Sequence, residues 1–450
     1  MMEERDYKRH TTSYISEIFP ALKFGLDVVD VPLKQPCISN LDIFFLISSI
    51  IMHLIDIAFD INIAVRYLLA NKIIYFSWTL LFLLIPSFIN VIISRRMQHQ
   101  DKEIDSDFVQ LENHKLAQIT IKRKVCCMLA IVFQLAPVIR YYDTLIYALK
   151  ARKYEKMGDY DRKKQYYFKM LKEDQDVALL RVFECFLEAA PQQILQLTIL
   201  LKHYNNDINL EYIHQVGSII SSLASMGWAM ASYNRSIRLA QRNKEVIGIW
   251  GSVCQFFWHF FVTVSRILTL SSIACLWPSY TIAACICHWV FMTVWIIVES
   301  RGVLQFCRKN NRPPHVSPTT VEKLNSILFA SVIGLVHIFV YLNVVDGNTF
   351  IRHIFFYGLY FFENLIAHVL RMFVPLTEGT NAWCFSISFF VLCTVFFLFG
   401  IVSMILYYTY FHPSKKNRAD ESNLRNQDAT QTACLNILNL PTNDTNERET

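Results

Sequence analysis

The chain has 450 residues, 53% of them hydrophobic, and a mean hydropathy of +0.29. This balance excludes an ordinary soluble domain, because long apolar runs rather than scattered core residues account for it. The net charge of +6 lies between these runs, so it indicates orientation in a membrane and not nucleic-acid binding. Twelve cysteines fall mostly inside the runs without the spacing of metal ligands, which predicts buried thiols.

The apolar runs follow one another along most of the chain. They cover residues 42–69, 73–93, 125–149, 177–201, 212–232, 246–277, 279–299, 324–345, 350–373 and 382–411. Each is near or above the roughly 20 residues that cross a bilayer core. Residues 1–40 lack the compact apolar core of a signal peptide, so we expect the first run to act as the insertion signal. The sequence therefore predicts a polytopic, all-α membrane protein.

The segments between the runs differ in charge, and this difference predicts the topology. Basic segments lie near 94–124, 150–176, 233–245 and 300–323 and at the start of the C-terminal tail, whereas 202–211, 346–349 and 374–381 are short and neutral or acidic. Because Lys and Arg mark the cytoplasmic side, we expect both termini in the cytoplasm. Runs 125–149 and 350–373 then have the same side at both ends, so we interpret them as half-inserted segments. Eight transmembrane helices remain.

The ten runs divide into two sets of five, each with one half-inserted segment. This order is close to that of an inverted repeat, and the interface of such repeats often holds a transport site. The predicted organisation is a cytoplasmic N-terminal tail at 1–41, two pseudo-symmetric membrane repeats at 42–245 and 246–413, and a cytoplasmic C-terminal tail at 414–450.

Ionisable and amide side chains recur at helical spacing inside several apolar runs. Those that share a helix face within one run are Arg181, Glu184, Glu188 and Gln192, and in another run His53, Asp56 and Asp60; single charges in other runs are Arg140, Arg266 and Glu363. Each centrally placed charge opposes membrane insertion by about 2.5–3.5 kcal/mol. We therefore expect these side chains to face one another or a hydrated groove.

The row of polar side chains has more than one interpretation. A buried ion-pair network can serve only to set the register of the helices. None of the twelve glycines precedes a lysine, and HExxH and GxSxG motifs are absent, so the sequence predicts no ATP-driven pump, no enzyme and no cofactor. The transport alternatives are a channel, a carrier with an enclosed site, and a lipid path along a groove open to acyl chains.

Several stretches of the sequence resemble the XK-related family, whose apoptotic members are caspase-activated phospholipid scramblases. They include "LIDIAFDINIAVRYL" (54–68), "FECFLEAAPQQILQL" (183–197) and "YYTYFHP" (407–413). The resemblance runs from about 41 to 413 and is greatest to the longer, neural-type members and to invertebrate cell-death relatives. It implies eight spanning helices and two half-inserted helices arranged as two repeats.

The resemblance also implies roles for individual residues. The positions that match the family's stepped path for lipid headgroups are Asp56, Asp60, Arg140, Glu184, Glu188, Arg235, Arg266 and Glu363. Trp78 matches a tryptophan thought to gate that path from outside. Ser232 stands where some members have an acidic residue, so one step of the path is missing or is supplied elsewhere.

By this resemblance, the expected function is ATP-independent phospholipid scrambling that exposes phosphatidylserine at the plasma membrane of dying cells. Two tail sites fit activation by a caspase, "LDVVD" ending at Asp30 and "RNQD" ending at Asp428. The expected partners are membrane phospholipids, a caspase, and an accessory membrane subunit or a second copy, with no nucleic acid and no metal. The alternative function is a non-scrambling membrane adaptor for a lipid-transfer protein or a partner subunit.

Overall fold

The computed structural model describes residues 38, 40–105, 136–202, 210–240, 247–299, 317–343, 349–373 and 381–412. These residues form helices, without a strand among them, which confirms the predicted all-α class. The helices are α2 (Asn40–Leu69), α3 (Ile73–Asp105), α5 (Ala136–Met157), α6 (Tyr160–Glu184), α7 (Ala190–Lys202), α8 (Leu210–Ala240), α9 (Ile249–Leu276), α10 (Pro278–Glu299), α12 (Thr320–His337), α13 (Thr349–Met372) and α14 (Asn381–Leu406). Two short π-helices, Cys185–Ala189 and Tyr407–Phe411, complete the set.

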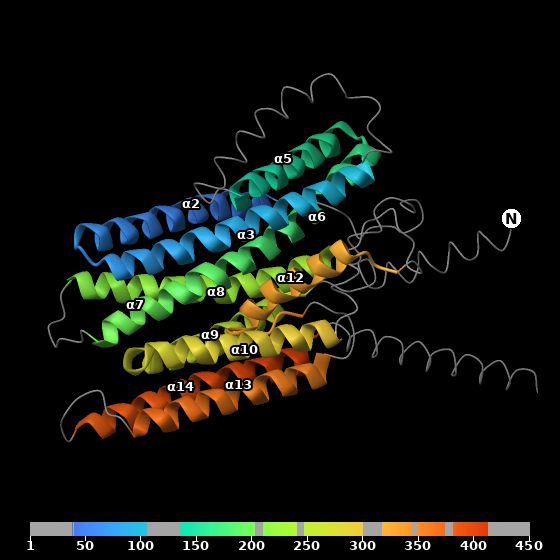
Figure 1. Cartoon of the computed structure of the whole chain (residues 1–450). Helices are drawn as coiled ribbons and strands as arrows, with labels where there is room; N and C mark the ends of the chain where they lie inside the picture. The colour runs from blue at the N-terminus through green and yellow to red at the C-terminus, as the bar shows by residue number, and fades with distance from the viewer. Residues whose placement is uncertain are drawn as a thin grey trace, which may run out of the picture.

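The helices lie roughly side by side, with α2 and α3 at one edge of the bundle and α13 and α14 at the other (Figure 1). Helix α9 occupies the middle and packs against α7, α8, α10, α13 and α14. Its buried face carries hydroxyl side chains that bond to the helix's own backbone, as Thr269 does to the Ser265 carbonyl at 2.8 Å and Ser271 to the Ile267 carbonyl at 2.7 Å. Because these hydroxyls bond to the backbone of their own helix, these short side chains project little from α9. Neighbouring helices therefore approach α9 closely.

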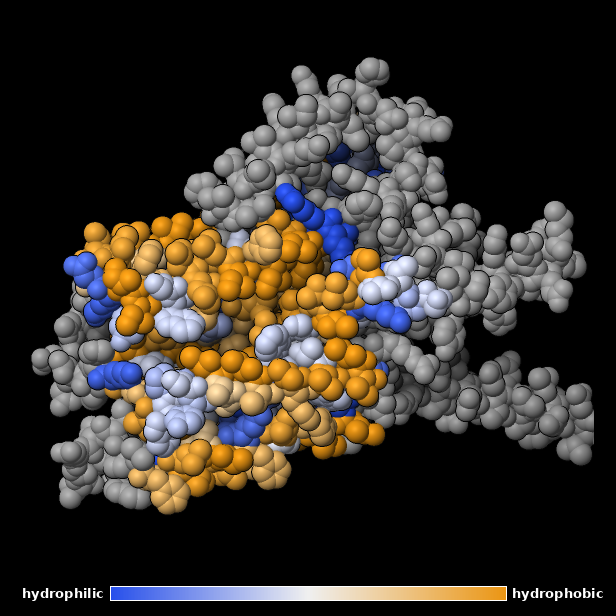
Figure 2. All heavy atoms as spheres, viewed as in Figure 1, coloured by the Kyte–Doolittle hydropathy of each residue, from blue (hydrophilic) through white to orange (hydrophobic). Residues whose placement is uncertain are grey.

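Four helices in the described part of the chain are long and apolar enough to cross a membrane. They span Ile73–Met97, Ile249–Leu276, Pro278–Glu299 and Ser386–Phe411. Within α14 only 17% of the apolar window is buried, and apolar residues cover most of the visible face of the bundle (Figure 2). Such an extensive exposed apolar surface is typical of a protein that faces lipid. The count of eight spanning helices and the two repeats remain predictions.

Helix α12 differs from its apolar run, which was expected to continue to residue 345. The helix ends at His337, and the N–H groups of Ile338 and Phe339 bond to carbonyls three residues back, at 3.2 and 3.0 Å. The buried imidazole of His337 then lies 3.1 Å from the Leu342 carbonyl, across the turn. Hydropathy alone does not distinguish a buried turn from a helix, and this turn is as apolar as the helix before it.

Helices α5 and α6 form an antiparallel hairpin that carries the basic segment near 150–176 (Figure 1). Gly158 turns the chain with a φ of 75°, a left-handed conformation that glycine adopts without strain. Asp159 then caps α6, since its carboxylate accepts a hydrogen bond from the Arg162 N–H at 3.1 Å. The hairpin thereby returns the chain toward the bundle, where α6 packs on α8. The prediction that run 125–149 is half-inserted stays open.

Two glycines give a direct test of how closely α14 packs on α9. A Cβ added at Gly400 would lie 2.6 Å from the Val262 side chain and 3.1 Å from its backbone nitrogen, whereas one added at Gly358 meets nothing within 4 Å. We expect Gly400→Ala to destabilise the fold by about 1–3 kcal/mol through overpacking, and Gly358→Ala to leave stability unchanged or slightly raised. Thermal unfolding of the two purified variants in detergent measures the difference. Equal midpoints would show that α9 and α14 do not pack in this way.

Candidate functional site

The predicted polar row lies on α6, α7 and the π-helix between them. Pro191 has no N–H, so a regular helix would leave the carbonyl four residues before it without a backbone partner. Instead the chain adopts π geometry over Cys185–Ala189, and the Ala190 N–H bonds to the carbonyl five residues earlier, at Cys185. Single π turns inside α-helices are frequent at functional sites. This turn places Glu188 within the polar row, 5% exposed.

Arg181 is the centre of the first charged cluster, which joins α2, α6 and α8. Its guanidinium donates to Asp56 Oδ2 at 2.6 Å and to Glu184 Oε1 at 2.6 Å. It also donates to the Ser225 hydroxyl at 3.0 Å, and His53 Nδ1 lies 2.9 Å from Glu184 Oε1. The structure thus brings together the two rows that were predicted separately on the first run and on the Glu184 run.

Asp60 and Glu188 form the next step of the same row. Their carboxyl groups lie close enough to interact with each other. Together with Asp56 and Glu184, the row then holds four carboxyl groups, against Arg181 and His53 as basic partners. Acidic groups therefore exceed basic ones along this part of the row.

Some polar atoms of the row are buried without a partner among the described residues. They are Glu184 Oε2, Gln192 Nε2 and Gln193 Oε1. A network that only sets helix register is stable when all its polar atoms are bonded, because each buried unsatisfied group costs about 1–3 kcal/mol. One acceptor on Glu184, one amide donor and one amide acceptor are therefore left unpaired by the described part of the protein.

The row is open on the side of α2. The side chain of Asp56 is 42% exposed although it belongs to the ion pair with Arg181, whose own side chain is 16% exposed. Its neighbours Leu54 and Ile55 on α2 are also exposed, as expected for an apolar helix that faces lipid. The polar row thus meets an apolar surface at α2 and is not an enclosed chamber at that point.

Arg140 was predicted to belong to the path, and the structure places it in a separate cluster. Its guanidinium is fully buried and donates to Glu173 at 2.8 Å and to Asp176 at 2.7 Å. It also donates to the hydroxyl and the carbonyl of Ser94, at 3.1 and 2.8 Å. These bonds join α3, α5 and α6 and satisfy the charge within the protein, which is the arrangement of a structural ion pair.

Arg266 and Glu363 form a third cluster in the second half of the chain. Arg266 Nη2 donates to Glu363 at 2.6 Å, and the other Glu363 oxygen lies 2.7 Å from His288 Nδ1. Arg266 also donates to Asn364 Oδ1 at 2.9 Å and to the Ile338 carbonyl at 3.0 Å, and it lies over the Tyr360 ring at 4.7 Å. The Ile338 carbonyl is one of the backbone groups left unpaired by the end of α12.

The remaining predicted residues lie apart from these clusters. Arg235 is exposed near the end of α8, and Trp78 is 38% exposed near the start of α3, where it stacks on Phe82 at 5.6 Å. Asp30 and Asp428 lie outside the described residues. Sequence reasoning missed the partners Glu173 and Asp176. They lie in a basic segment between two apolar runs, so they do not stand out as charged residues inside an apolar helix. Sequence reasoning also missed Ser225, His288 and Asn364.

Comparison with known proteins gives the family. The sequence is 27% identical over 403 residues to the Cell death abnormality protein 8 of Caenorhabditis briggsae, covering 88% of this chain and 83% of that protein. It is likewise 27% identical over 383 residues to the protein of the same name from Caenorhabditis elegans, covering 83% and 79%. The sequence profile of the XK-related protein family matches residues 44–413, which include all three charged clusters. The chain belongs to the XK-related family.

Proposed function

We propose that this protein is a phospholipid scramblase whose headgroup path is the polar row of α2, α6 and α7. The observation that carries the proposal is the exposure of Asp56, whose side chain is 42% accessible beside an exposed apolar face of α2. A carrier needs an enclosed site, whereas a scramblase needs a polar row beside an apolar surface, so that a headgroup moves along one while acyl chains stay on the other. This arrangement supports the lipid path over the other transport alternatives.

The unsatisfied atoms of the row match the chemistry of a zwitterionic headgroup. Glu184 Oε2 is an acceptor suited to an ammonium group, and Gln192 Nε2 is a donor suited to a phosphate oxygen. The excess of carboxyl groups favours the cationic part of a headgroup. Movement down a gradient by exchange of such contacts needs no nucleotide.

The setting that we propose for this activity is cell death. Both nematode relatives bear the name Cell death abnormality protein, and scrambling of phospholipids would expose phosphatidylserine on the surface of a dying cell. The proposal places the chain in the plasma membrane with both termini in the cytoplasm, in agreement with the basic segments between its apolar runs. The partners included in this proposal are an accessory membrane subunit or a second copy of the chain.

The activity is tested with liposomes that contain the purified chain with its tails removed. We expect a fluorescent phospholipid in the inner leaflet to become accessible to an impermeant quencher without added ATP, because the sequence carries no nucleotide-binding motif. Empty liposomes and liposomes with an unrelated membrane protein are the controls. A folded chain that leaves the leaflets distinct would contradict scrambling and support the adaptor function.

Activation by tail cleavage is a separate prediction. Asp30 completes an acid-x-x-Asp pattern, and Asp428 precedes a small residue in the C-terminal tail. We expect a chain with different tags on its two tails to lose one tag during induced apoptosis, and the Asp30→Ala/Asp428→Ala double variant to keep both tags and to expose little phosphatidylserine. The two single variants identify which tail is cut. Normal lipid exposure by a double variant that keeps both tags would show that tail release is not the switch.

A further inference from the structure

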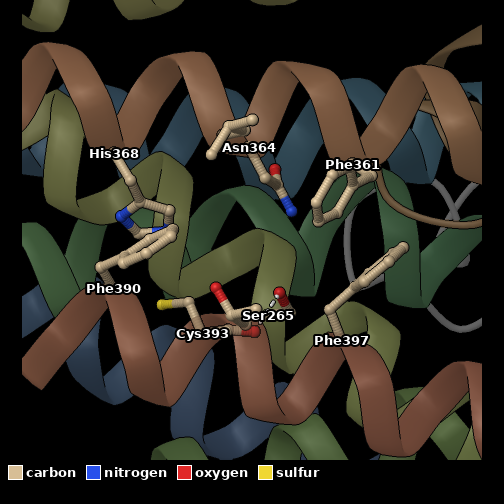
Figure 3. Close-up of a pocket in the computed structure, with 9 residues that line it drawn as sticks. Ser265, Phe361, Asn364, His368, Phe390, Cys393 and Phe397 are labelled. Atoms are coloured by element: carbon tan, nitrogen blue, oxygen red, sulfur yellow. Dashed lines mark hydrogen bonds between the residues drawn. The ribbon is translucent and has the colours of Figure 1, made fainter.

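The cavity between α13 and α14 is too small for a lipid or a peptide (Figure 3). Asn364 and His368 border it on α13, and Phe390 and Phe397 border it on α14. It measures about 20 Å³, which is room for one water molecule. A larger partner finds room on the surface, where the hairpin of α5 and α6 carries a face of mixed apolar and basic character.

The hairpin extends past the apolar part of the bundle. Arg140, near the start of α5, donates to the Ser94 carbonyl, which lies close to the end of the apolar span of α3 at Met97. From Arg140 to Met157, α5 rises by about 25 Å at about 1.5 Å per residue. The second half of α5 therefore lies beyond the apolar span of α3, on the side where the basic segments predict the cytoplasm (Figure 1).

The outer face of α5 consists of Leu149, Lys153, Lys156 and Met157, which share one side of the helix by their spacing. The side chain of Leu149 is 48% exposed and that of Met157 is 67% exposed. Both lysines are exposed as well. Apolar side chains exposed together outside the membrane part of a protein indicate a surface that a partner covers.

The charge of this face is also uncompensated. On the hairpin, Lys163 pairs with Glu155 at 2.7 Å and Arg162 with Asp159 at 3.4 Å. Neither Lys153 nor Lys156 has a carboxylate partner within the part of the chain that the structure describes. A partner for the face therefore needs acidic groups between apolar ones.

The N-terminal tail of the chain reaches the bundle at this hairpin. Ile38 is 8% exposed and packs against Ala148 and Ala151 of α5. Residues 1–37, outside the described part of the chain, thus lead directly to α5. In this tail the stretch "FGLDVVDV" (24–31) combines five apolar residues with Asp27 and Asp30 and has no basic residue.

The stretch can reach the outer face. An extended chain spans about 3.3–3.6 Å per residue, so Asp30 can lie up to about 26–29 Å from Ile38. Along α5 the rise from Ala148 to Lys156 is about 12 Å, and a helix with its side chains is about 10–12 Å wide. Asp27 and Asp30 also have the same spacing of three residues as Lys153 and Lys156.

We propose that residues 24–31 of the N-terminal tail dock on the outer face of α5. Their apolar side chains cover Leu149 and Met157, and the two aspartates pair with Lys153 and Lys156. Weak contacts suffice for this docking, because the tail is tethered to α5 through Ile38 and its effective concentration at the face is high.

Two other occupants fit this face less well. The apolar patch of the C-terminal tail, "ACLNILNL" (433–440), has no acidic residue to pair with the lysines. The anionic headgroups of the surrounding membrane are distant, because α5 rises by about 20 Å from Arg140 to Lys153. Salt screens the attraction between charges that are further apart than about 8 Å.

Docking has a consequence that rests on the proposed function. Asp30 is one of the two residues at which we expect a caspase to cut. Cleavage after Asp30 would separate both aspartates of the docked stretch from Ile38, so the stretch would leave the hairpin and expose the outer face of α5 to the cytoplasm. The docking itself is measured without reference to lipid movement, so its failure and the failure of scrambling are distinguishable.

The test uses the full-length chain in nanodiscs of neutral phosphatidylcholine. Leu149 or Met157 is replaced by the photo-crosslinking amino acid benzoylphenylalanine, and cross-linked tryptic peptides are identified by mass spectrometry. We expect a cross-link to the peptide of residues 24–34, which trypsin releases by cutting after Lys23 and Lys34. The control is the same probe at Val298, which is 80% exposed on α10, away from α5 in the bundle (Figure 1). It should give no such cross-link.

Charge reversal makes the test specific. Lys153→Glu/Lys156→Glu should lower the yield of cross-links to residues 1–37 by about tenfold, because two exposed ion pairs become repulsive. Asp27→Lys/Asp30→Lys should have the same effect, and the four substitutions together should restore most of the yield. The thermal midpoint should not change in the lysine variant, since both side chains are exposed.

Three outcomes would overturn the proposal. Cross-links from positions 149 and 157 to lipid alone would assign the face to the membrane. Cross-links to residues 414–450 in place of the N-terminal tail would assign it to the other tail. An unchanged yield in both charge-reversed variants would show that the aspartates and lysines do not pair.

Discussion

The double variant Glu184→Gln/Glu188→Gln is expected to fold and reach the cell surface but to scramble lipid at least tenfold more slowly. Glutamine at 184 still offers an oxygen to Arg181, which keeps its 2.6 Å bond to Asp56. Glutamine at 188 keeps the size of the side chain and removes one of two neighbouring carboxyl groups. A hydrogen bond to a charged group contributes about 1.5–3 kcal/mol, so its loss at each step of the path slows transport by about tenfold or more.

The measurements are surface expression, thermal unfolding in detergent, and lipid movement in liposomes. Arg181→Met is the matched control for a purely structural role, because it leaves Asp56 and Glu184 without their cation. The pair of Arg181 with Glu184 is largely buried, and breaking such a pair typically destabilises a protein by about 3–5 kcal/mol, so we expect little folded Arg181→Met protein. If the double Gln variant folds and moves lipid at the normal rate, the row is not the headgroup path.

Arg266→Met is expected to cause the largest loss of stability in the second half of the chain. It removes the 2.6 Å ion pair with Glu363, the donors to Asn364 and the Ile338 carbonyl, and the contact with the Tyr360 ring. Glu363 then keeps only His288 as a partner, and removing one partner of such a pair typically destabilises a protein by about 3–5 kcal/mol. Size-exclusion profiles and thermal midpoints of the purified variants measure the effect.

A second substitution separates the charge from the packing. Arg266→Met/Glu363→Gln removes the uncompensated charge and should recover part of the lost stability, since the new glutamine side chain would remain beside His288. Arg352→Met breaks a more exposed pair, with Glu299 at 2.5 Å, and should lower stability by no more than about 1 kcal/mol. Equal losses for Arg266→Met and Arg352→Met would mean that the Arg266 cluster is not buried as described.

The sequence predicted the charged rows well because helical spacing places residues on one face without knowledge of the fold. Arg181 and Glu184 are three residues apart and bond to each other. The need to compensate charges in hydrocarbon predicted that the charged side chains would face one another or a hydrated groove, and Asp56 bonds to Arg181. Spacing does not reveal which row meets which isolated charge. Arg140, for example, pairs with Glu173 and Asp176 and not with the acidic groups around Arg181. Its place on the path, which the resemblance implied, stays a prediction.

Hydropathy predicted the helical class but not where every helix ends. The run 324–345 is apolar throughout, yet α12 ends at His337, because a buried imidazole and a buried guanidinium satisfy backbone carbonyls in the turn that follows. His337 lies 3.1 Å from the Leu342 carbonyl and Arg266 donates to the Ile338 carbonyl. These partners come from tertiary structure, and a single-sequence window does not contain that information.

The π-helix between α6 and α7 makes the length of this segment as important as its side chains. One residue advances a regular helix by about 100°, so a π turn rotates everything after it by that amount relative to an uninterrupted helix. Deleting a single residue from Cys185–Ala189 would allow a regular helix to form with Gln192 and Gln193 still in their present direction relative to Arg181, because the lost residue and the lost π turn change the rotation by opposite amounts. Closing the π turn without a deletion would turn Gln192 and Gln193 away by about 100°. Homologous sequences should therefore either keep the length and the π turn between Arg181 and Gln192 or lack a single residue there, and other insertions or deletions in this segment should be rare.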